Sequence, residues 1–487
     1  MYRRTQAIRP VLIACGLVLS LQIPARSVGV FPADDASGGQ AVPAFHDFSA
    51  PQRLPPVEDF DPGEPPRQST VDDLHARFDA LENEWKKLKA AEAKKEDEAA
   101  EKPTFRMGGQ IQIDAIWFGQ DAESRAAVGD VQDALNFRRA RLTAQGEAFG
   151  VFNYAIGFDF ALGTATNGRP SFLDVFIGAK DLPVVGNARV GHFFEPFSLE
   201  RITFNRHNTF LERSLADTFA PARNLGGMIF NHAEDERSTW ALGTFRSNSD
   251  NFGDDAGDQE GQAVTGRYTW LPFYDQASGG RSYLHLGSGY SYRQAADGVV
   301  QYRSRPEVIG RSDNENISTP FFVDTGTLAA NSNQLFGAES LWTHGPFSVQ
   351  GEYMYVPIDR VGGSDVDFHG AYLYASYFLT GEHRPYDRTR GITDRIEPFE
   401  NFFRVRTADG PICTGRGAWE VAARVSHINL TDEGVNGGRL TDFTASLNWY
   451  LTPYHRVKWE YIHAQLDRAP SGRTETDIFG MRFGMDF

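Results

Sequence analysis

Closely spaced arginines are the residues of this chain best suited to bind a ligand. Between residues 137 and 147, polar side chains alternate with small or apolar ones. One parity holds Arg139, Arg141, Thr143, Gln145 and Glu147, and the other holds Ala140, Leu142, Ala144 and Gly146. Residues two apart share one face of a β-strand, so the segment predicts a strand with a polar, cationic face. A guanidinium keeps its charge and offers a planar fork of donors to carboxylate or phosphate oxygens, so this face could bind small oxyanions.

Five further arginines belong to the candidate site. Arg138 has the apolar parity of that segment, but it lies near the start, where its side chain can reach water. The stretch 195–223 shows no strand alternation and holds Arg201, Arg206, Arg213 and Arg223. Long ordered loops are usually functional, so we expect these arginines to serve the same site. In the alternative interpretation, the arginines pair with acids such as Glu147 and Asp159 and only support the fold.

No catalytic or metal-binding pattern accompanies these arginines. Ser426, His427 and Asp442 could form a catalytic set, but nothing in the sequence brings them together. Of the two cysteines, Cys15 lies in a leader-like segment and Cys413 in a predicted loop, which gives neither a disulfide framework nor a thiolate metal site. The sequence has neither a phosphate-cradling glycine loop nor a basic stripe for nucleic acid. We therefore expect no enzyme, no cofactor, no metal and no nucleic-acid partner.

The elements that position the arginines are predicted to be β-strands. From Phe105 onward, segments of alternating polar and apolar residues are separated by Gly, Asn, Asp and Pro. Clear cases are residues 152–160, 347–355, 442–451, 456–461 and 479–487. The last segment places Phe479, Met481, Phe483, Met485 and Phe487 on one face. Lipid covers such a face when the segment is the closing strand of a membrane barrel.

A soluble sandwich also explains this alternation, but three features favour a membrane barrel. Aromatic residues gather near the predicted strand ends, as at a membrane interface. Connections alternate between short ones, such as 452–454, and long ones, such as 385–415. A leader-like N-terminus is present as well. We predict an all-β transmembrane barrel over residues 103–487 with sixteen antiparallel strands, because bacterial single-chain barrels have even numbers.

The chain ahead of the barrel divides into three predicted parts. Residues 1–27 combine a basic start, an apolar stretch and small residues at Ala25 and Ser27, which predicts a signal peptide. Residues 28–69 are rich in Pro, Gly, Asp and Ser, which predicts a disordered tether. The pattern of apolar residues in 70–102 predicts a helix. Mean hydropathy is −0.41, and no apolar run beyond the N-terminus is long enough for a membrane-spanning helix.

The predicted helix has the apolar spacing of a coiled coil. Steps of three and four residues alternate along Val71, Leu74, Phe78, Leu81, Trp85 and Leu88. Pro103 ends the pattern. A single amphipathic helix lying on another surface is the alternative. A three-stranded coiled coil would suit a trimeric barrel.

Several segments, in order along the chain, resemble the phosphate-selective porin O and P family. They are 137–142 (FRRARL), 194–200 (FEPFSLE), 210–213 (FLER), 219–226 (FAPARNLG), 376–382 (SYFLTGE) and 447–450 (LNWY). The similarity covers essentially residues 105–487. It implies a trimeric barrel of sixteen strands in the outer membrane, whose third loop folds inward and narrows the channel. The stretch 195–223 occupies the place of that loop.

The resemblance also implies that arginines and lysines of the channel conduct small anions. Here the chain departs from the family's pattern, because only Lys180 and Lys458 occur past Pro103. Gln110 stands where a basic residue often occurs in the family. The lysine cluster expected for trapping phosphate is therefore missing.

These observations predict a trimeric outer-membrane diffusion porin for small anionic, phosphate-like solutes. Its expected partners are those solutes, outer-membrane lipid and two further copies of the chain. The candidate pore-lining and anion-binding residues are Arg138, Arg139, Arg141, Arg201, Arg206, Arg213 and Arg223. The alternative function is a structural anchor, in which the N-terminal coiled coil tethers the membrane to the cell wall.

Overall fold

The computed structural model describes residues 75–89, 102–161, 169–253, 257, 261–310, 318–406 and 412–487. The predicted signal peptide at 1–27 and tether at 28–69 lie outside this part of the chain. Residues 75–89 form a helix, described here by itself, in which every side chain is exposed, including Phe78, Leu81, Trp85 and Leu88. The coiled coil stays a prediction, and the remainder of 70–102 lies mostly outside the described residues. None of the described helices is both long and apolar enough to cross a membrane.

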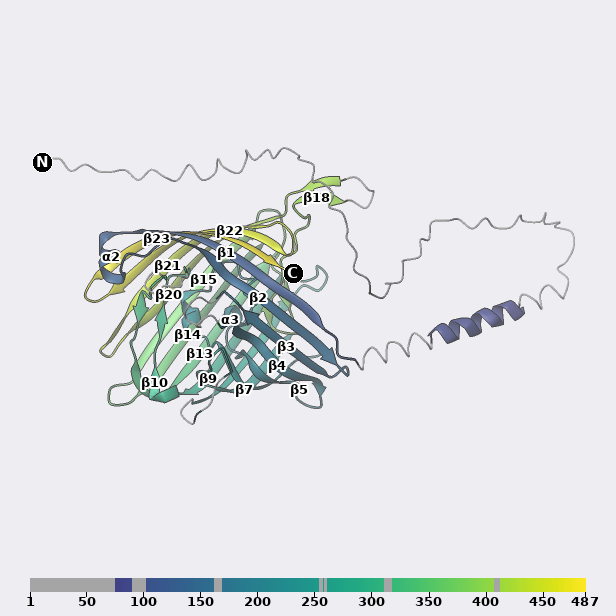
Figure 1. Cartoon of the computed structure of the whole chain (residues 1–487), viewed down its shortest axis with the longest axis horizontal. Coiled ribbons are helices and arrows are strands. Elements are labelled where there is room, and N and C mark those ends of the chain that lie inside the picture. The colour runs from purple at the N-terminus through teal and green to yellow at the C-terminus, as the bar shows by residue number, and fades with distance from the viewer. Residues whose placement is uncertain are drawn as a thin grey trace, which may run out of the picture. The chain divides into compact units, whose positions relative to one another are not determined.

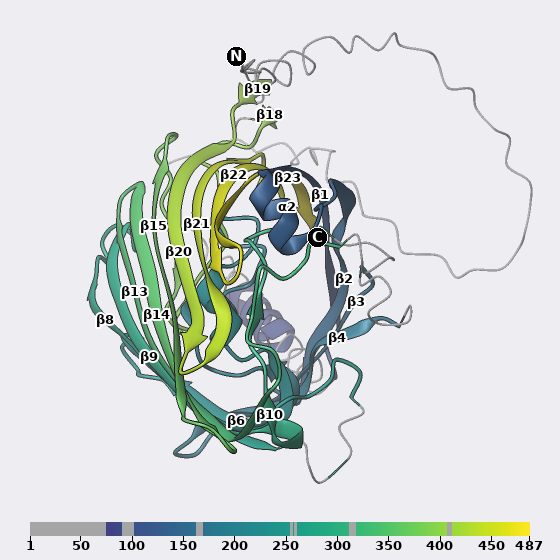
Figure 2. The ribbon, with the colours of Figure 1, turned by 90° about the vertical axis from the view of Figure 1, so that its left-hand side faces the viewer.

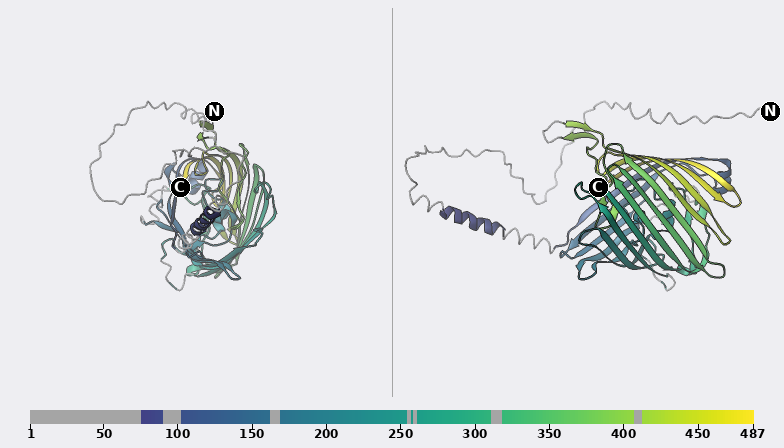
Figure 3. Two further views of the ribbon diagram at one scale, coloured as in Figure 1. Left: turned by 90° about the vertical axis from the view of Figure 1, so that its right-hand side faces the viewer. Right: turned by 180° about the vertical axis from the view of Figure 1, so that it is seen from behind.

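Sixteen antiparallel strands close into a barrel (Figures 1 and 3). They are β1 (Arg106–Gln120), β2 (Ala134–Ala148), β3 (Phe152–Asp159), β4 (Ser171–Leu182), β5 (Gly186–Phe194), β6 (Arg223–His232), β7 (Ser238–Arg246), β8 (Gln262–Tyr274), β9 (Ser282–Gln294), β13 (Leu328–His344), β14 (Phe347–Arg360), β15 (Val366–Phe378), β20 (Ala418–Asp432), β21 (Val435–Tyr450), β22 (His455–Arg468) and β23 (Gly472–Asp486). Each strand pairs with its neighbour in this order, and β23 pairs with β1. The predicted strand number and barrel closure are confirmed.

Shorter elements lie in the connections. The helices are α2 (Ala122–Val128) and α3 (Leu199–Ile202), with 3-10 turns η2 (Leu215–Phe219) and η3 (Ala296–Gly298). The minor strands are β10 (Val299–Val300), β11 (Arg303–Ser304), β12 (Val323–Asp324), β16 (Tyr386–Asp387), β17 (Ile392–Thr393), β18 (Phe403–Arg406) and β19 (Ile412–Gly415). β10 adds two residues beside β13 at the edge of the barrel sheet.

The side chains alternate between the two faces of the barrel wall as the sequence predicts. On β23, Phe479 and Phe483 are exposed on the outer face, whereas Arg482 and Asp486 are buried on the inner face. On β21, Phe443 is likewise outside, and Asp442 and Asn448 are inside. An apolar outer face and a polar inner face are the arrangement of a barrel whose outside meets hydrocarbon.

A β-bulge in β2 changes the expected direction of Arg138. Gln112 pairs with Arg139 and the next residue of β1, Ile113, pairs with Phe137, so Arg138 is the extra residue. A bulge inserts one unpaired residue and re-aims the side chains beside it. Arg138 is 5% exposed and donates to Glu212 from the inner face. The parity that placed Arg138 on the outer side is therefore wrong.

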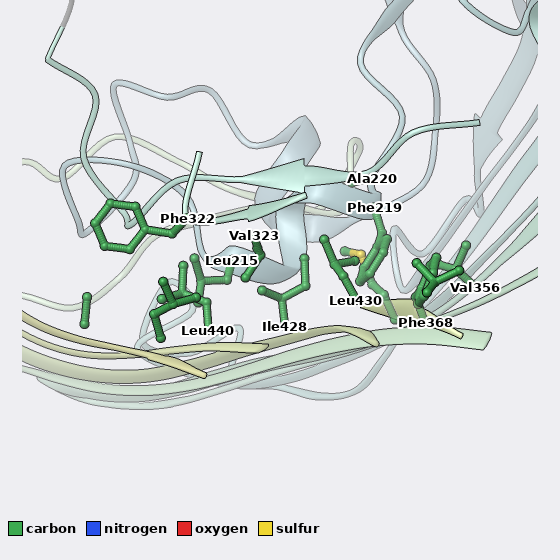
Figure 4. Packing of buried hydrophobic residues seen from close by; sticks show 14 of the residues in the cluster. Leu215, Phe219, Ala220, Phe322, Val323, Val356, Phe368, Ile428, Leu430 and Leu440 are labelled. Atoms are coloured by element: carbon green, nitrogen blue, oxygen red, sulfur yellow. The ribbon is translucent and has the colours of Figure 1, made fainter. Parts of the chain in front are cut away.

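The connection 195–222 between β5 and β6, called the constriction loop here, folds into the barrel interior. It is the third connection at its end of the barrel, after β1–β2 and β3–β4, as predicted. Ser198 caps α3 by accepting a hydrogen bond from the Arg201 amide at 3.1 Å. Figure 2 shows segments crossing the interior, and Figure 4 shows Leu215 and Phe219 packed against inner-face residues of the wall.

The connection between β15 and β20, described over 379–406 and 412–417, lies at the end of the barrel where β1 begins and β23 ends, which we call the terminal end. Within it, Arg395 donates to Asp486 at 2.6 Å and to the Pro453 carbonyl at 2.5 Å. Pro453 belongs to the short turn between β21 and β22. The prediction that 385–415 and 452–454 continue a strict alternation of long and short connections is wrong, because both join strands at the terminal end. The other end is called the loop end.

Candidate pore lining

A cavity of about 380 Å³ lies inside the barrel between the constriction loop and the first strands. Its charged lining is strongly cationic. Seven arginines contribute: Arg106, Arg139, Arg141, Arg206, Arg213, Arg223 and Arg395. The acids are Asp174 and Asp486. Five of the seven arginines predicted from the sequence line this cavity, and Arg138 and Arg201 do not.

The arginines of β2 have carboxylate partners. Arg139 donates to Gln112 at 2.7 Å and to Glu212 at 3.0 Å, and its side chain is 5% exposed. Arg138 reaches the same Glu212 at 2.8 Å. Arg141 pairs with Asp159 at 2.7 Å and is more accessible, at 18% exposed. Arg138 and Arg139 therefore hold the constriction loop, whereas Arg141 presents part of its charge to the cavity.

Three arginines of the stretch 195–223 are held in defined positions. Arg201 forms an ion pair with Asp217 at 2.9 Å and donates to the Ala220 carbonyl, within the loop itself. Arg213 donates to the carbonyls of Glu200 and Arg201, both at 2.9 Å. Arg223, which begins β6, binds Asp174 of β4 at 3.0 Å.

Arg206 differs from these arginines because it has no ion pair with a carboxylate among the described residues. Its guanidinium lies over the Phe204 ring, 4.6 Å from the centroid, and its Nε is 3.3 Å from His207 Nε2. Burial and the neighbouring Arg206 lower the pKa of His207 to about 2, so the imidazole is neutral. Arg206 therefore contributes positive charge at the constriction that no described carboxylate neutralises by an ion pair.

Carboxylates of the barrel wall bind the backbone of the constriction loop. The amides of Leu199 and Glu200 donate to Glu339 and Glu352, each at 2.7 Å. The Leu211 amide donates to Glu460 at 3.0 Å. A buried amide without a partner is costly, so these acids fix the course of the loop. Many acids of the inner wall are thus engaged by the loop and do not face the cavity.

The two lysines of the barrel lie away from the cavity. Lys458 is buried and donates to the carbonyls of Asn208 and Thr209 in the constriction loop. Lys180 pairs with Glu147 at 2.8 Å. Gln110, which stands where a basic residue often occurs in the family, lines the cavity.

Sequence reasoning missed Arg106 and Arg395 of the cavity lining, and also Arg189, which lies over Phe176 in the barrel interior. Arg189 has the same parity as Gly191 on β5, opposite to that of the exposed Val190, so an inspection of the alternation in 186–194 would have found it. Arg395 lies in an irregular connection with no periodic signal, so only the fold reveals its place. Arg106 begins β1, where strand periodicity has barely started.

Of the residues considered for catalysis, Ser426 and Asp442 are paired directly across β20 and β21 on the inner face, whereas His427 points to the other face. Ser426 lies on the inner face of β20 and accepts from the Leu215 amide at 2.8 Å. His427 has the opposite parity and contacts Thr441 Oγ1 at 2.8 Å. Across the described parts of the chain, no group of three or more His, Cys, Asp or Glu side chains is arranged to hold a metal ion.

Comparison with known proteins finds two sequence relatives and a solved porin structure that resemble this chain. Porin O of Pseudomonas aeruginosa is 26% identical over 403 residues, covering 77% of this chain and 86% of that protein. A protein of Caulobacter vibrioides described as uncharacterized is 26% identical over 408 residues, covering 79% of this chain and 74% of that one. Among solved structures, an anion-selective porin from Comamonas acidovorans covers 79% of this chain and 100% of its own, with 11% identity and a TM-score of 0.48.

The family model described as phosphate-selective porin O and P matches residues 105–487. This range contains every strand of the barrel, the constriction loop and all seven arginines around the cavity. The chain therefore belongs to the phosphate-selective porin O and P family of outer-membrane porins.

Proposed function

We propose that this porin is a passive diffusion channel selective for small anions, phosphate-like solutes among them. The observation that carries the proposal is the excess of arginine over acid around the cavity, seven against two. The net charge of the whole chain is −16, which would by itself favour cations. In a narrow pore, however, the local ring of charge governs selectivity more than the total charge does.

The chemistry of the lining supports a broad preference for anions over a trap specific for phosphate. Guanidinium groups accept both carboxylates and phosphates, because their donors lie in a plane that matches two oxygens. Most of the arginines are partly neutralised, and neither lysine of the barrel reaches the cavity. A solute would meet a weakly binding cationic surface, which suits conduction.

Planar-bilayer recording with the purified full chain tests the proposal. Under a salt gradient of potassium chloride, the reversal potential should show preferential passage of chloride. A preference for potassium would remove the anion proposal, and absence of channels would remove the diffusion proposal.

The trimer remains part of the proposal, and the uneven height of the barrel wall supports it. β3, β5 and β7 have 8, 9 and 9 residues, whereas β13 and β21 have 17 and 16. A membrane-spanning strand needs about 9–11 residues. The side of the barrel formed by β3, β5 and β7 is therefore barely tall enough to span the hydrocarbon layer. Contact with a neighbouring copy would shield this side from lipid. Light scattering of the detergent-solubilised protein should give the mass of three chains.

A second candidate function is an anchor between the outer membrane and the cell wall. The helix at 75–89 exposes Phe78, Leu81 and Trp85, which favours a partner for that face. Deleting residues 30–102 should leave chloride conductance unchanged if the chain is a porin. If the segment also anchors, the deletion should release the protein from sedimenting cell-wall material.

A further inference from the structure

Arginines of the barrel interior repeatedly lie over phenylalanine rings. Arg189 lies over Phe176 with 3.8 Å between the guanidinium carbon and the ring centroid. Arg223 lies over Phe194 at the same distance. The guanidinium carbons of Arg206 and Arg390 lie 4.6 Å and 5.6 Å from the centroid of the Phe204 ring. Such an aromatic lining is unusual for a lumen, whose side chains are typically polar.

These rings meet in a second cavity of about 260 Å³ next to the first. The linings of the two cavities share five residues: Gln145, Ala155, Asp174, Phe194 and Phe204. The volume is close to the lower end, roughly 300 Å³, of pockets that hold small molecules. Its apolar lining includes Phe176, Phe194, Ile202, Phe204, Met228 and Phe230.

Arg189 is the charged group of this cavity that is most available to a ligand. It forms no ion pair with a carboxylate among the described residues, and its Nε is buried without a hydrogen-bond partner there. The other charges are engaged: Arg267 binds Glu339 at 2.5 Å, and Asp174 binds Arg223 at 3.0 Å. Arg390 lies 3.7 Å from Asp387, which is a loose contact.

We propose that this cavity is a subsite for organic anions that carry a flat aromatic or similar apolar group, with the anionic end at Arg189 and the ring against Phe204 and Phe230. The proposal rests on the proposed anion-conducting function and narrows its substrate class. The Arg189 guanidinium lies over Phe176 and also lies 5.4 Å from the Phe193 centroid and 5.2 Å from the Phe230 centroid. A guanidinium stacked on aromatic rings can still donate through its N–H edge to an oxyanion. The apolar lining can bury the ring of such a ligand, which stabilises its binding, whereas a hydrated inorganic anion has no apolar surface to bury there.

Competition with chloride current through single channels of the full chain tests the subsite. Benzoate and acetate carry the same charge and the same carboxylate, but only benzoate has a ring. Benzoate should halve the current at a concentration about tenfold lower than acetate, which corresponds to about 1.4 kcal/mol. Cyclohexanecarboxylate should fall between the two.

Substitutions assign the effect to the cavity. Phe230→Ala and Phe204→Ala should each raise the half-blocking concentration of benzoate severalfold and leave that of acetate unchanged. Arg189→Gln should weaken block by both anions. Phe443→Ala, on the outer face of β21, is the matched control and should change neither value. The unblocked chloride current of each variant reports that its barrel has folded, and Phe204 in the loop provides a second site should a strand variant fail to fold.

The outcomes separate this subsite from the anion channel itself. Equal half-blocking concentrations for benzoate and acetate would overturn the proposal of the subsite. The proposal of an anion channel would still stand in that case if the reversal potential showed preference for chloride. A benzoate preference that survives both phenylalanine substitutions would also overturn it. Loss of chloride selectivity in the unsubstituted protein would instead count against the proposed function.

Discussion

Arg482 on the closing strand donates to Glu212 of the constriction loop at 2.6 Å, and so ties the loop to the strand that seals the barrel. The same guanidinium holds Asp114 of β1 at 2.6 Å. Arg138 and Arg139 reach Glu212 from β2. One loop carboxylate therefore collects three arginines from the two strands that flank β1.

Replacing Glu212 by alanine should loosen the constriction loop. Three buried guanidinium groups would lose a shared partner, and breaking a buried ion pair typically costs about 3–5 kcal/mol. We expect a lower urea midpoint for unfolding in detergent and a larger, noisier single-channel current. Glu147→Ala is the control, because the exposed Glu147–Lys180 pair should contribute roughly 0–1 kcal/mol. Equal behaviour of the two variants would show that Glu212 does not hold the loop.

Arg206 and Arg201 should contribute unequally to anion selectivity, although they lie close together in the loop. Arg201 is neutralised by Asp217 at 2.9 Å, whereas Arg206 faces the cavity without an ion pair to any described carboxylate. Arg206→Ala should shift the reversal potential in a potassium chloride gradient towards that of potassium. Arg201→Ala should shift it less. The opposite ranking would mean that the loop rearranges in the membrane.

The alternation of side chains allowed the sequence to predict the wall of the barrel, because lipid outside and polar contacts inside impose a period of two. It could not predict which inner-face groups face the pore. Glu339 and Glu460 resemble pore acids in sequence, yet each binds a loop amide, a contact between residues far apart in the chain. The sequence also could not predict the bulge at Arg138, because an inserted residue shifts the alternation of faces without changing the type of residue at that position.

The position of the constriction loop against the barrel wall depends on a glycine of the wall, Gly289. A Cβ at Gly289 of β9 would lie 2.5 Å from the Phe197 carbonyl oxygen, which belongs to backbone and cannot turn away. Gly289→Ala should therefore displace the loop and destabilise the barrel by about 1–3 kcal/mol, measured by urea unfolding. A Cβ at Gly227 would meet nothing nearer than 3.8 Å, so Gly227→Ala is the control. Unfolding midpoints that coincide for both variants would contradict this packing.

The charge of the constriction should not depend on His207 between pH 8 and pH 5. An unperturbed histidine, with a pKa of about 6.5, would become positive over this range and strengthen anion selectivity. Burial, followed by the charge of Arg206, lowers the pKa of His207 to about 2, so in the folded channel the ring stays neutral throughout. Reversal potentials of the unsubstituted protein and of His207→Ala should therefore follow the same course as the pH falls, whatever the nearby carboxylates contribute. Divergence of the two curves near pH 6 would show that His207 takes up a proton in the open channel and adds to its cationic ring.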